Sequence, residues 1–524
     1  MTSFGQPTLL HHTFPYDVIT PTLWKDGLTE VVSPAERDRD SLARRRRRER
    51  PKRGDTITRA MSGGGKSVSL DSLLNPGVRT ILIKGEPGTG KTILALELLR
   101  RHGKGVYLSS RVSEERILRH HPRTKAFFEE RKTASAKRKK DARFEDARLG
   151  TAAMAIESVL NAMSGPGAEE PLVVLDSWDT MARELDGVER LKAEKTLLTL
   201  ADAKKASLVF VSEEPSSTTV DYATDAVVTL RDETRDGRRA RRIEWNKLRG
   251  SEIPQKFNLF SLHDARFTLF TPAETRPPPG YKPKRFQPIK NPPDLYSTGS
   301  RDLDALLGGG MKRGLRMLLE LGRHVGSDWH LPLMVGMSCN FILNGCCYMS
   351  IPTLGVTPER VKEARSGHLP VETLGSSLRI GHFGETQSTD RCFFQMDPSS
   401  ASKSFEASWK ATEEVRAGGG GERRACLMII GMDRVEATFG NEALGPLFAR
   451  GAIMTEGYGD AAVFVVKQST KSKDMLADIT DAHLKLDEID GAPVIYAMKP
   501  PSGIYHLEYD YGRGYPSVGL TPVT

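Results

Sequence analysis

The chain of 524 residues is 38% hydrophobic and 27% charged with a formal net charge of +9, which is typical of a soluble globular protein with two or three domains. No apolar run approaches the roughly 20 residues that span a bilayer, and the N-terminus lacks a secretory signal, so we expect a cytoplasmic protein without a membrane partner. Five cysteines without CxxC spacing argue against a disulfide framework and against a zinc site.

The first 60 residues show weak hydrophobic periodicity and contain an arginine-rich block at 43–53. We expect residues 1–60 to form a disordered basic N-terminal region. Two further basic clusters lie at 137–140 and 238–242, and such clusters either form solvated surface or bind phosphates and acidic partners. Aromatic residues are not interleaved with them, so a base-stacking platform for nucleic acid is not indicated.

Residues 61–271 alternate short apolar strands with helices. This order predicts a parallel sheet covered by helices on both faces. The segments 226–250 and 257–270 are predicted to follow it as antiparallel strands, with a turn at Asp236 and Gly237. The expected parallel strands are 80–84, 105–110, 171–179 and 207–214. One helix is expected to begin near residue 91, and two others are expected at 151–163 and 188–206.

A proline-dense segment at 272–296 is predicted to be a stiff, extended linker rather than a packed element. After it, residues 297–524 repeat the order of elements of the first half. Gly85 corresponds to Leu321, and Asp176 corresponds to Asp433. The offset grows from 236 to 257 along the chain, which insertions in the second half explain. We interpret the two halves as a duplication.

The motif GEPGTGKT fits the phosphate-binding pattern GxxxxGK[ST] and lies between a predicted strand and a predicted helix. Its glycines let backbone N–H groups turn inward toward phosphate oxygens, and the helix N-terminus adds partial positive charge. Lys91 supplies a full charge to the β- and γ-phosphates of ATP. The candidate nucleotide-binding residues are Gly85, Glu86, Pro87, Gly88, Thr89, Gly90, Lys91 and Thr92.

Two oxygen ligands for Mg²⁺ are predicted, the Thr92 hydroxyl and the carboxylate of Asp176. Asp176 ends the buried strand LVVLD, where a parallel sheet presents a carboxylate to the metal; an ordinary turn aspartate is the alternative. In the second half, Ser327 and Asp328 replace the lysine and threonine of the motif. Because Asp328 adds negative charge, we expect the second site to bind nucleotide poorly or not at all.

These residues resemble KaiC-type RecA-fold P-loop ATPases. The segment STGSRDLDALLGGGMKRG (297–314) is similar to the entry segment of a KaiC domain, and residues 221–262 are similar to its end. The resemblance implies two tandem RecA/KaiC-like α/β domains, the second degenerate, in a homo-oligomer that is a hexamer or a dimer. It also implies that Lys247 and Arg249 act as cations on a neighbour's γ-phosphate; surface cations on an edge strand are the alternative.

A second resemblance is more specific. The segment VYLSSRVSEERI (106–117) is similar to archaeal gas vesicle regulators of the GvpD family. That family combines an intact P-loop with arginine-rich patches and restrains the transcription activator GvpE. The resemblance implies a regulatory protein partner of the GvpE type, repression of gas vesicle formation, and a functional patch at 238–242.

One departure from active KaiC proteins concerns catalysis. That family carries two glutamates after the second strand, whereas this chain has Ser110 and Arg111. Glu114 and Glu115 lie a turn further on and are poorly placed to replace them. A missing general base costs roughly 10²- to 10⁴-fold in rate. We therefore expect binding of ATP and Mg²⁺ with slow or absent hydrolysis, which leaves the enzymatic status open.

The preferred hypothesis is an ATP-binding regulatory protein that controls a protein partner. The alternatives are a DNA-dependent KaiC/RecA-like ATPase that uses the Arg/Lys clusters and a KaiC-like kinase. A nucleic acid partner is possible but not favoured, and no Ser/Thr pair placed as in KaiC supports the kinase. A scaffold that binds no nucleotide disagrees with the intact P-loop.

Overall fold

The computed structural model of the chain places residues Gly65–Thr524 in one compact unit. The predicted disordered region at 1–60 and the basic cluster at 137–140 lie outside the described residues. In the part of the chain described here, no helix has the length and apolar character needed to cross a membrane. The described residues are 68–122, 141–148, 151–164, 170–214, 216, 218–272, 276–384, 389–417, 423–441 and 457–524.

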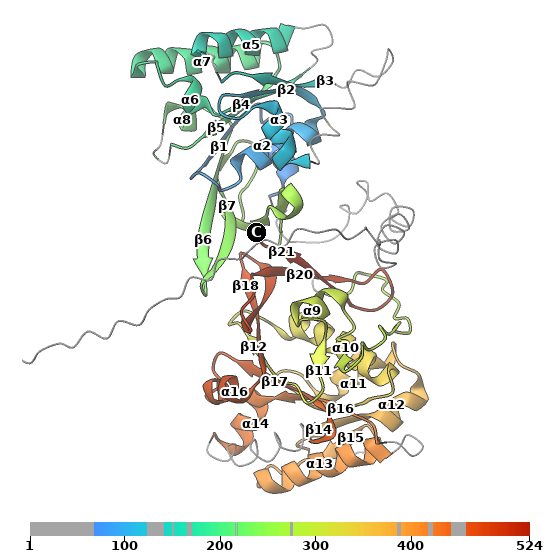
Figure 1. Cartoon of the computed structure of the whole chain (residues 1–524). Coiled ribbons are helices and arrows are strands. Elements are labelled where there is room, and N and C mark those ends of the chain that lie inside the picture. Colours follow the sequence, from blue (N-terminus) through green and yellow to red (C-terminus); the bar gives the residue numbers. More distant parts are fainter. Residues whose placement is uncertain are drawn as a thin grey trace, which may run out of the picture. The chain divides into compact units, whose positions relative to one another are not determined.

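The first half is an α/β domain built on a nine-stranded sheet with the order β3-β2-β4-β5-β1-β6-β7-β8-β9 (Figure 1). Along this order, each pair of neighbours from β3 to β6 is parallel, and each pair from β6 to β9 is antiparallel, as predicted. The strands are β1 (Thr80–Gly85), β2 (Lys104–Ser109), β3 (Asp141–Asp146), β4 (Leu172–Asp176), β5 (Ser207–Ser212), β6 (Ala226–Arg235), β7 (Arg238–Leu248), β8 (Phe257–Ser261) and β9 (Thr268–Leu269).

Helices cover both faces of this sheet, because alternate side chains of each strand point to opposite faces. Ile81 and Ile83 of β1 join the core under α2, whereas Leu82 joins the core under α5 and α7. Figure 1 shows α5 and α7 together on one face. The helices are η1 (Leu70–Leu74), α2 (Lys91–His102), α3 (Glu114–His120), α5 (Ala152–Ser164), α6 (Trp178–Met181), α7 (Gly187–Ala203) and α8 (Thr219–Ala223).

The second half repeats this architecture around a ten-stranded sheet with the order β15-β14-β13-β16-β17-β12-β18-β19-β20-β21. Strand β12 takes the place of β1, and an additional strand, β15, extends one edge. The duplication is thus visible in the topology. The strands are β12 (Arg316–Leu321), β13 (Cys347–Ile351), β14 (Leu378–His382), β15 (Phe393–Gln395), β16 (Cys426–Gly431), β17 (Ala461–Lys467), β18 (Ala482–Ile489), β19 (Ala492–Lys499), β20 (Tyr505–Asp510) and β21 (Ser517–Pro522).

The helices of the second half include α10, which follows β12 as α2 follows β1. A separate two-stranded sheet pairs β10 with β11. These elements are β10 (Leu295–Tyr296), α9 (Arg301–Leu306), β11 (Met311–Lys312), α10 (Ser327–Leu343), α11 (Pro358–Ser366), α12 (Val371–Ser377), α13 (Ala401–Ala417), α14 (Met432–Phe439) and α16 (Lys473–Ile479).

The sheet register corrects one expected correspondence between the halves. Asp176 lies opposite Val211 in β5, and Gly431 lies opposite Val465 in β17. The two valines occupy the same level beside β1 and β12. Gly431, and not Asp433, therefore stands where Asp176 stands in the first half. Asp433 lies two residues further on, in the first turn of α14.

The predicted linker runs along the second half. Residues 276–294 contain no helix or strand. Phe286 is buried in the second core, and its backbone N–H donates to the carbonyl oxygen of His368. The N–H of Ile289 donates to Asn340 of α10 at 2.7 Å. The segment is thus extended, as predicted, but the prediction that it would not be a packed element was wrong, because Phe286 and Ile289 anchor it to the second half.

The two halves meet through their antiparallel strands. One small hydrophobic core contains residues of β7 and β8 together with residues of β18, β19 and their neighbours. Its members from the first half are Ala240, Leu259 and Phe270, and its members from the second half are Ile489, Ala492, Val494, Tyr496, Ile504 and Val523. The hairpin β6–β7 therefore belongs to the first sheet and to the contact between halves.

Candidate functional site

The motif at 85–92 forms a tight loop between β1 and α2. Gly85, Gly88 and Gly90 all have positive φ angles, of 149°, 83° and 106°. A Cβ atom on Gly85 would lie 2.6 Å from the carbonyl oxygen of Leu230, and one on Gly90 would lie 2.7 Å from the side chain of Leu262. Both positions therefore favour glycine for conformation, and Gly85 also needs it for space, because its neighbour is backbone. The loop delivers the chain directly into the N-terminus of α2.

Lys91 lies at the first position of α2, with its side chain folded back over the loop. Its Nζ donates to the carbonyl oxygens of Gly85 at 2.7 Å and Glu86 at 2.8 Å. Burial lowers the pKa of Lys91 below its ordinary value, although the nearby carboxylates of Glu213 and Asp176 act in the opposite direction. The ammonium group is thus held at the mouth of the loop.

Thr92 and Asp176 come together as expected for a pair of metal ligands. The Thr92 hydroxyl donates to Oδ2 of Asp176 at 2.7 Å, and the Tyr107 hydroxyl donates to the same oxygen. Burial, followed by the charge of Asp176, raises the pKa of Tyr107 well above its ordinary value, so Tyr107 remains a donor. A hydroxyl and a carboxylate are hard oxygen donors, and Mg²⁺ takes few protein ligands beside phosphate and water. The donor set therefore fits Mg²⁺.

Two further charged residues lie beside Lys91, and sequence reasoning missed one of them. Arg111, noted only as a replacement for a glutamate, donates from Nη1 to Oε1 of Glu213 at 2.6 Å. The same Glu213 oxygen lies 3.8 Å from Nζ of Lys91. Glu213 directly follows β5, whose carboxyl end meets the end of β1, and that position was the available signal.

The predicted trans-acting cations have partners in their own half. Lys247 Nζ donates to the carbonyl oxygens of Asp221 and Tyr222, and Arg249 Nη1 donates to Asp225 at 3.1 Å. Within the described residues, neither side chain bonds to the loop at 85–92. A role at a neighbour's phosphate stays a prediction.

The basic cluster 238–242 lies on β7 and faces the second half. Arg238 donates to the carbonyl oxygens of Ala497 and Ser502, both at 2.7 Å. Arg242 forms a two-pronged pair with Asp490, at 2.7 and 2.6 Å. Three of the four arginines thus bind protein groups of the second half, since Arg241 does so as well.

Arg241 connects the phosphate-binding loop with the second half. Its Nε donates to the backbone oxygen of Thr524 at 2.8 Å, and its Nη1 donates to the carbonyl oxygen of Gly88 at 3.1 Å. The N–H of Leu262, whose side chain covers Gly90, also donates to Thr524, at 3.2 Å. A change in the loop therefore has a direct route to the other half.

In the second half, Asp328 and Asp433 each have counter-ions within the protein. Asp328 at the start of α10 pairs with Arg276 at 2.9 Å and with Arg360. Burial tends to raise the pKa of Asp328, but the hydrogen bonds from both arginines outweigh it and leave the pKa below its usual value. Asp433 pairs with Lys467 at 2.9 Å. These contacts neutralise both carboxylates within the protein.

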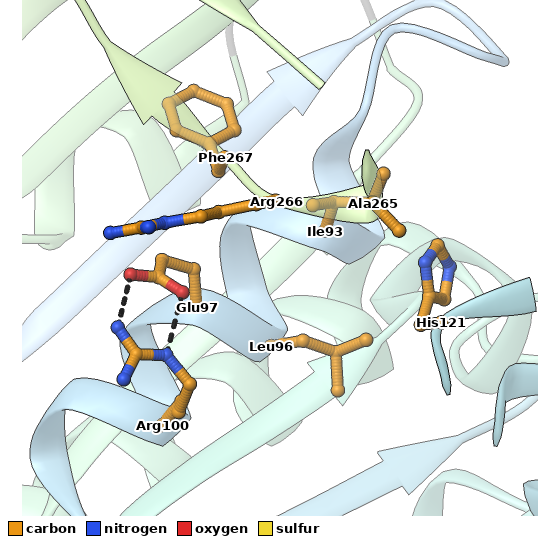
Figure 2. A pocket seen from close by; sticks show the side chains of 8 residues that line it. All are labelled: Ile93, Leu96, Glu97, Arg100, His121, Ala265, Arg266 and Phe267. Atoms are coloured by element: carbon orange, nitrogen blue, oxygen red, sulfur yellow. Dashed lines mark hydrogen bonds and ion pairs between the residues drawn. The ribbon is translucent and has the colours of Figure 1, made fainter. Parts of the chain in front are cut away.

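A separate pocket of about 280 Å³ lies against α2 (Figure 2). Glu97 lines it, and Arg100 and Arg101 bind its carboxylate at distances of 2.7–2.9 Å. Burial acts to raise the pKa of Glu97, but the two arginines outweigh it and hold the pKa below its ordinary value. None of residues 85–92 lines this pocket, so it is distinct from the nucleotide site.

Comparisons with known proteins agree with this geometry. Residues 74–246 match the model of the GvpD gas vesicle protein, P-loop domain. Protein GvpD2 of Halobacterium salinarum is 26% identical over 469 residues, which cover 84% of this chain and 93% of that protein. Protein GvpD1 of the same organism is 23% identical over 512 residues, again 84% of this chain and 93% of the relative. The matched domain contains the loop, Asp176, Arg111, Glu213 and most of β7.

Proposed function

The chain is a P-loop protein of the GvpD type, and on this premise we propose that it regulates gas vesicle formation by binding ATP with Mg²⁺. Nucleotide binding in the first half would control a protein partner, such as a transcription activator of the GvpE type. The observation that best supports the proposal is that the loop with the phosphate-binding motif is connected to the second half.

The chemistry of the first half supports ATP and Mg²⁺ as ligands. Lys91 would bind the β- and γ-phosphates, and the N–H groups of the loop at 85–92 would bind phosphate oxygens. Thr92 and Asp176 would hold Mg²⁺, which supplies charge neutralisation for the phosphates when bound. Hydrolysis would be slow, because Arg111 cannot act as a general base.

The second half supports a regulatory role without a second nucleotide. A triphosphate there would meet Asp328 and would have to displace Arg276 and Arg360 from it. The second half would instead present its surface to the partner. Ligand binding shifts a conformational equilibrium only through contacts that differ between states, and the contact of Arg241 with Gly88 is such a candidate.

A DNA-dependent ATPase is the main alternative, and a KaiC-like kinase is another. The first stays weaker because Arg238, Arg241 and Arg242 bind groups of the second half. The kinase stays weaker because the sequence has no Ser/Thr pair placed as in KaiC. Measuring ATP turnover with and without DNA separates the first alternative from regulation. Strong stimulation by DNA would favour the ATPase.

Calorimetric titration of the full chain with ATP and Mg²⁺ tests the proposal. We expect one site per chain, loss of binding in Lys91→Ala, and normal binding in the control Lys104→Ala, which removes an exposed lysine of β2. Two bound nucleotides per wild-type chain, or unchanged binding in Lys91→Ala, would contradict it. Capture of a purified GvpE-type activator should depend on ATP in the wild-type chain and lose that dependence in Lys91→Ala.

A further inference from the structure

Arg111 and Glu213 lie at the carboxyl edge of the first sheet, beside the predicted phosphate site. Arg111 follows β2, and Glu213 follows β5; β4 lies between these strands in the sheet. The Arg111 side chain spans that gap, donating from Nε to the Thr180 hydroxyl at 2.9 Å and from Nη1 to Glu213 at 2.6 Å. The arginine thus reaches from the far side of β4 toward Lys91.

One oxygen atom of Glu213 serves two cations. Oε1 accepts from Arg111 at 2.6 Å and lies 3.8 Å from Nζ of Lys91. A lysine at this position in a phosphate loop contacts the β- and γ-phosphates. A carboxylate within 4 Å of it therefore occupies the neighbourhood where the negative charge of a terminal phosphate is favoured.

The backbone of Glu213 is fixed, whereas its carboxylate and the Arg111 head are accessible. The Glu213 N–H and the Ser212 hydroxyl both donate to Oδ2 of Asp179, at 2.7 and 2.8 Å. Asp179 is in turn bound by Arg190 at 2.9 Å. The side chains of Arg111 and Glu213 are 41% and 26% exposed. They can change partners without unfolding the strand ends.

We propose that Arg111 and Glu213 form a selector for the terminal phosphate of ATP. Arg111 binds the γ-phosphate from within the same subunit, and Glu213 is the internal anion that this phosphate displaces from Arg111 and Lys91. The inference rests on the proposed function, because it assumes that the loop at 85–92 binds adenine nucleotides.

The selector explains how a site without a general base distinguishes ATP from ADP. ADP lacks the phosphate that competes with Glu213, so the Arg111–Glu213 pair persists when ADP binds. ATP breaks this pair and gains a charged hydrogen bond from the Arg111 guanidinium, which matches phosphate geometry. The state of this pair therefore reports whether the third phosphate is present.

The test measures dissociation constants by calorimetry, with Mg²⁺, for ADP and for an ATP analogue that is not hydrolysed. Arg111→Ala is expected to weaken analogue binding about tenfold or more, the value of one hydrogen bond to a charged group, and to change ADP binding less than about twofold. Arg111→Lys should restore part of the loss. Glu213→Gln keeps the shape but removes the competing charge, so analogue binding should strengthen severalfold and clearly more than ADP binding, which gains only through the β-phosphate on Lys91.

The control is Arg119→Ala, which removes an exposed arginine of the neighbouring helix α3 that pairs with the exposed Glu115. It should change neither constant. Equal weakening of both ligands in Arg111→Ala, no change in that variant, or weaker analogue binding in Glu213→Gln would overturn the selector. A wild-type chain that binds neither ligand would instead refute the proposed function itself.

Discussion

Arg241 donates a hydrogen bond from Nη1 to the carbonyl oxygen of Gly88 at 3.1 Å, so an arginine of strand β7 supports the middle of the phosphate-binding loop. The same guanidinium holds the backbone oxygen of Thr524 at 2.8 Å. Its side chain is 7% exposed and both hydrogen bonds are partly buried, so truncating the side chain should be felt at both ends. This contact directly connects the candidate nucleotide site with the second half.

Replacing Arg241 with alanine should weaken nucleotide binding and reduce stability. The loop loses an anchor at Gly88, and the backbone oxygens of Gly88 and Thr524 lose a charged donor. We expect affinity for ATP to fall about threefold to tenfold and the free energy of unfolding to fall by about 2–3 kcal/mol. Calorimetry and urea denaturation measure the two effects.

The matched control is Arg239→Ala, which removes an exposed arginine of the same strand paired with Asp232. Exposed ion pairs contribute little, so stability should change by less than about 1 kcal/mol and affinity should stay constant. Equal effects of the two substitutions would show that Arg241 has no special connection with the loop.

Restoring the motif residues in the second half should not restore binding. In Ser327→Lys combined with Asp328→Thr, the loop still has Leu321 and His324 where the first half has glycines. Nothing in the double variant supplies a carboxylate at Gly431, the position equivalent to Asp176. Titration should still give one nucleotide per chain, and a second equivalent would show that only the two substituted residues close the site.

The buried pair of Asp460 and Arg416 should be important for the stability of the second half. Their side chains are 0% and 1% exposed, and Asp460 also accepts from the N–H of Cys426 at 2.8 Å. Asp460→Asn removes the buried carboxylate partner of the Arg416 guanidinium and leaves it only the 3.4 Å ion pair with Glu413 and a weak bond to Arg424, which should cost about 3–5 kcal/mol in the free energy of unfolding. Urea denaturation measures this loss.

The control for that prediction is Asp481→Asn, which breaks the partly exposed pair with Arg316. Its expected cost is below about 1 kcal/mol. If both variants lose the same free energy, burial of the Asp460 pair is not what makes it important.

Acid should destabilise the protein through His506. This ring is 7% exposed and stacks on Phe270 at 4.0 Å, and neither ring nitrogen has a hydrogen-bond partner in the described part of the chain. Burial lowers the pKa of His506 from 6.5 to about 4. The unfolded chain binds the proton first, so stability is full above about pH 6.5 and is lost progressively as the pH falls through about 4.

At pH 5 the loss from His506 should be about 2 kcal/mol relative to pH 8. His506→Phe keeps the stacking and removes the proton site, so its free energy of unfolding should fall less between these values in urea denaturation. An unchanged slope in His506→Phe would contradict the assignment.

Much of the fold and part of the site could be predicted from the sequence. The alternation of apolar strands and helices predicted both parallel sheets, and parallel strands that end at one edge predicted that Thr92 and Asp176 would approach. Periodicity does not specify register, so the position of Asp433 was wrong by two residues. The sequence of a charge cluster also does not indicate which groups it binds, and only the structure shows Arg242 bound to Asp490, 248 residues later.

Because Asp328 and Asp433 already have counter-ions, we expect the second half not to respond to the ratio of ATP to ADP. The carboxylates there are already neutralised by protein cations, so neither ATP nor ADP has a free charged group to bind. Its conformation would then stay the same while nucleotide binding changes the first half. A partner bound to the second half would respond to the ratio of ATP to ADP only through a change in the orientation of the first half.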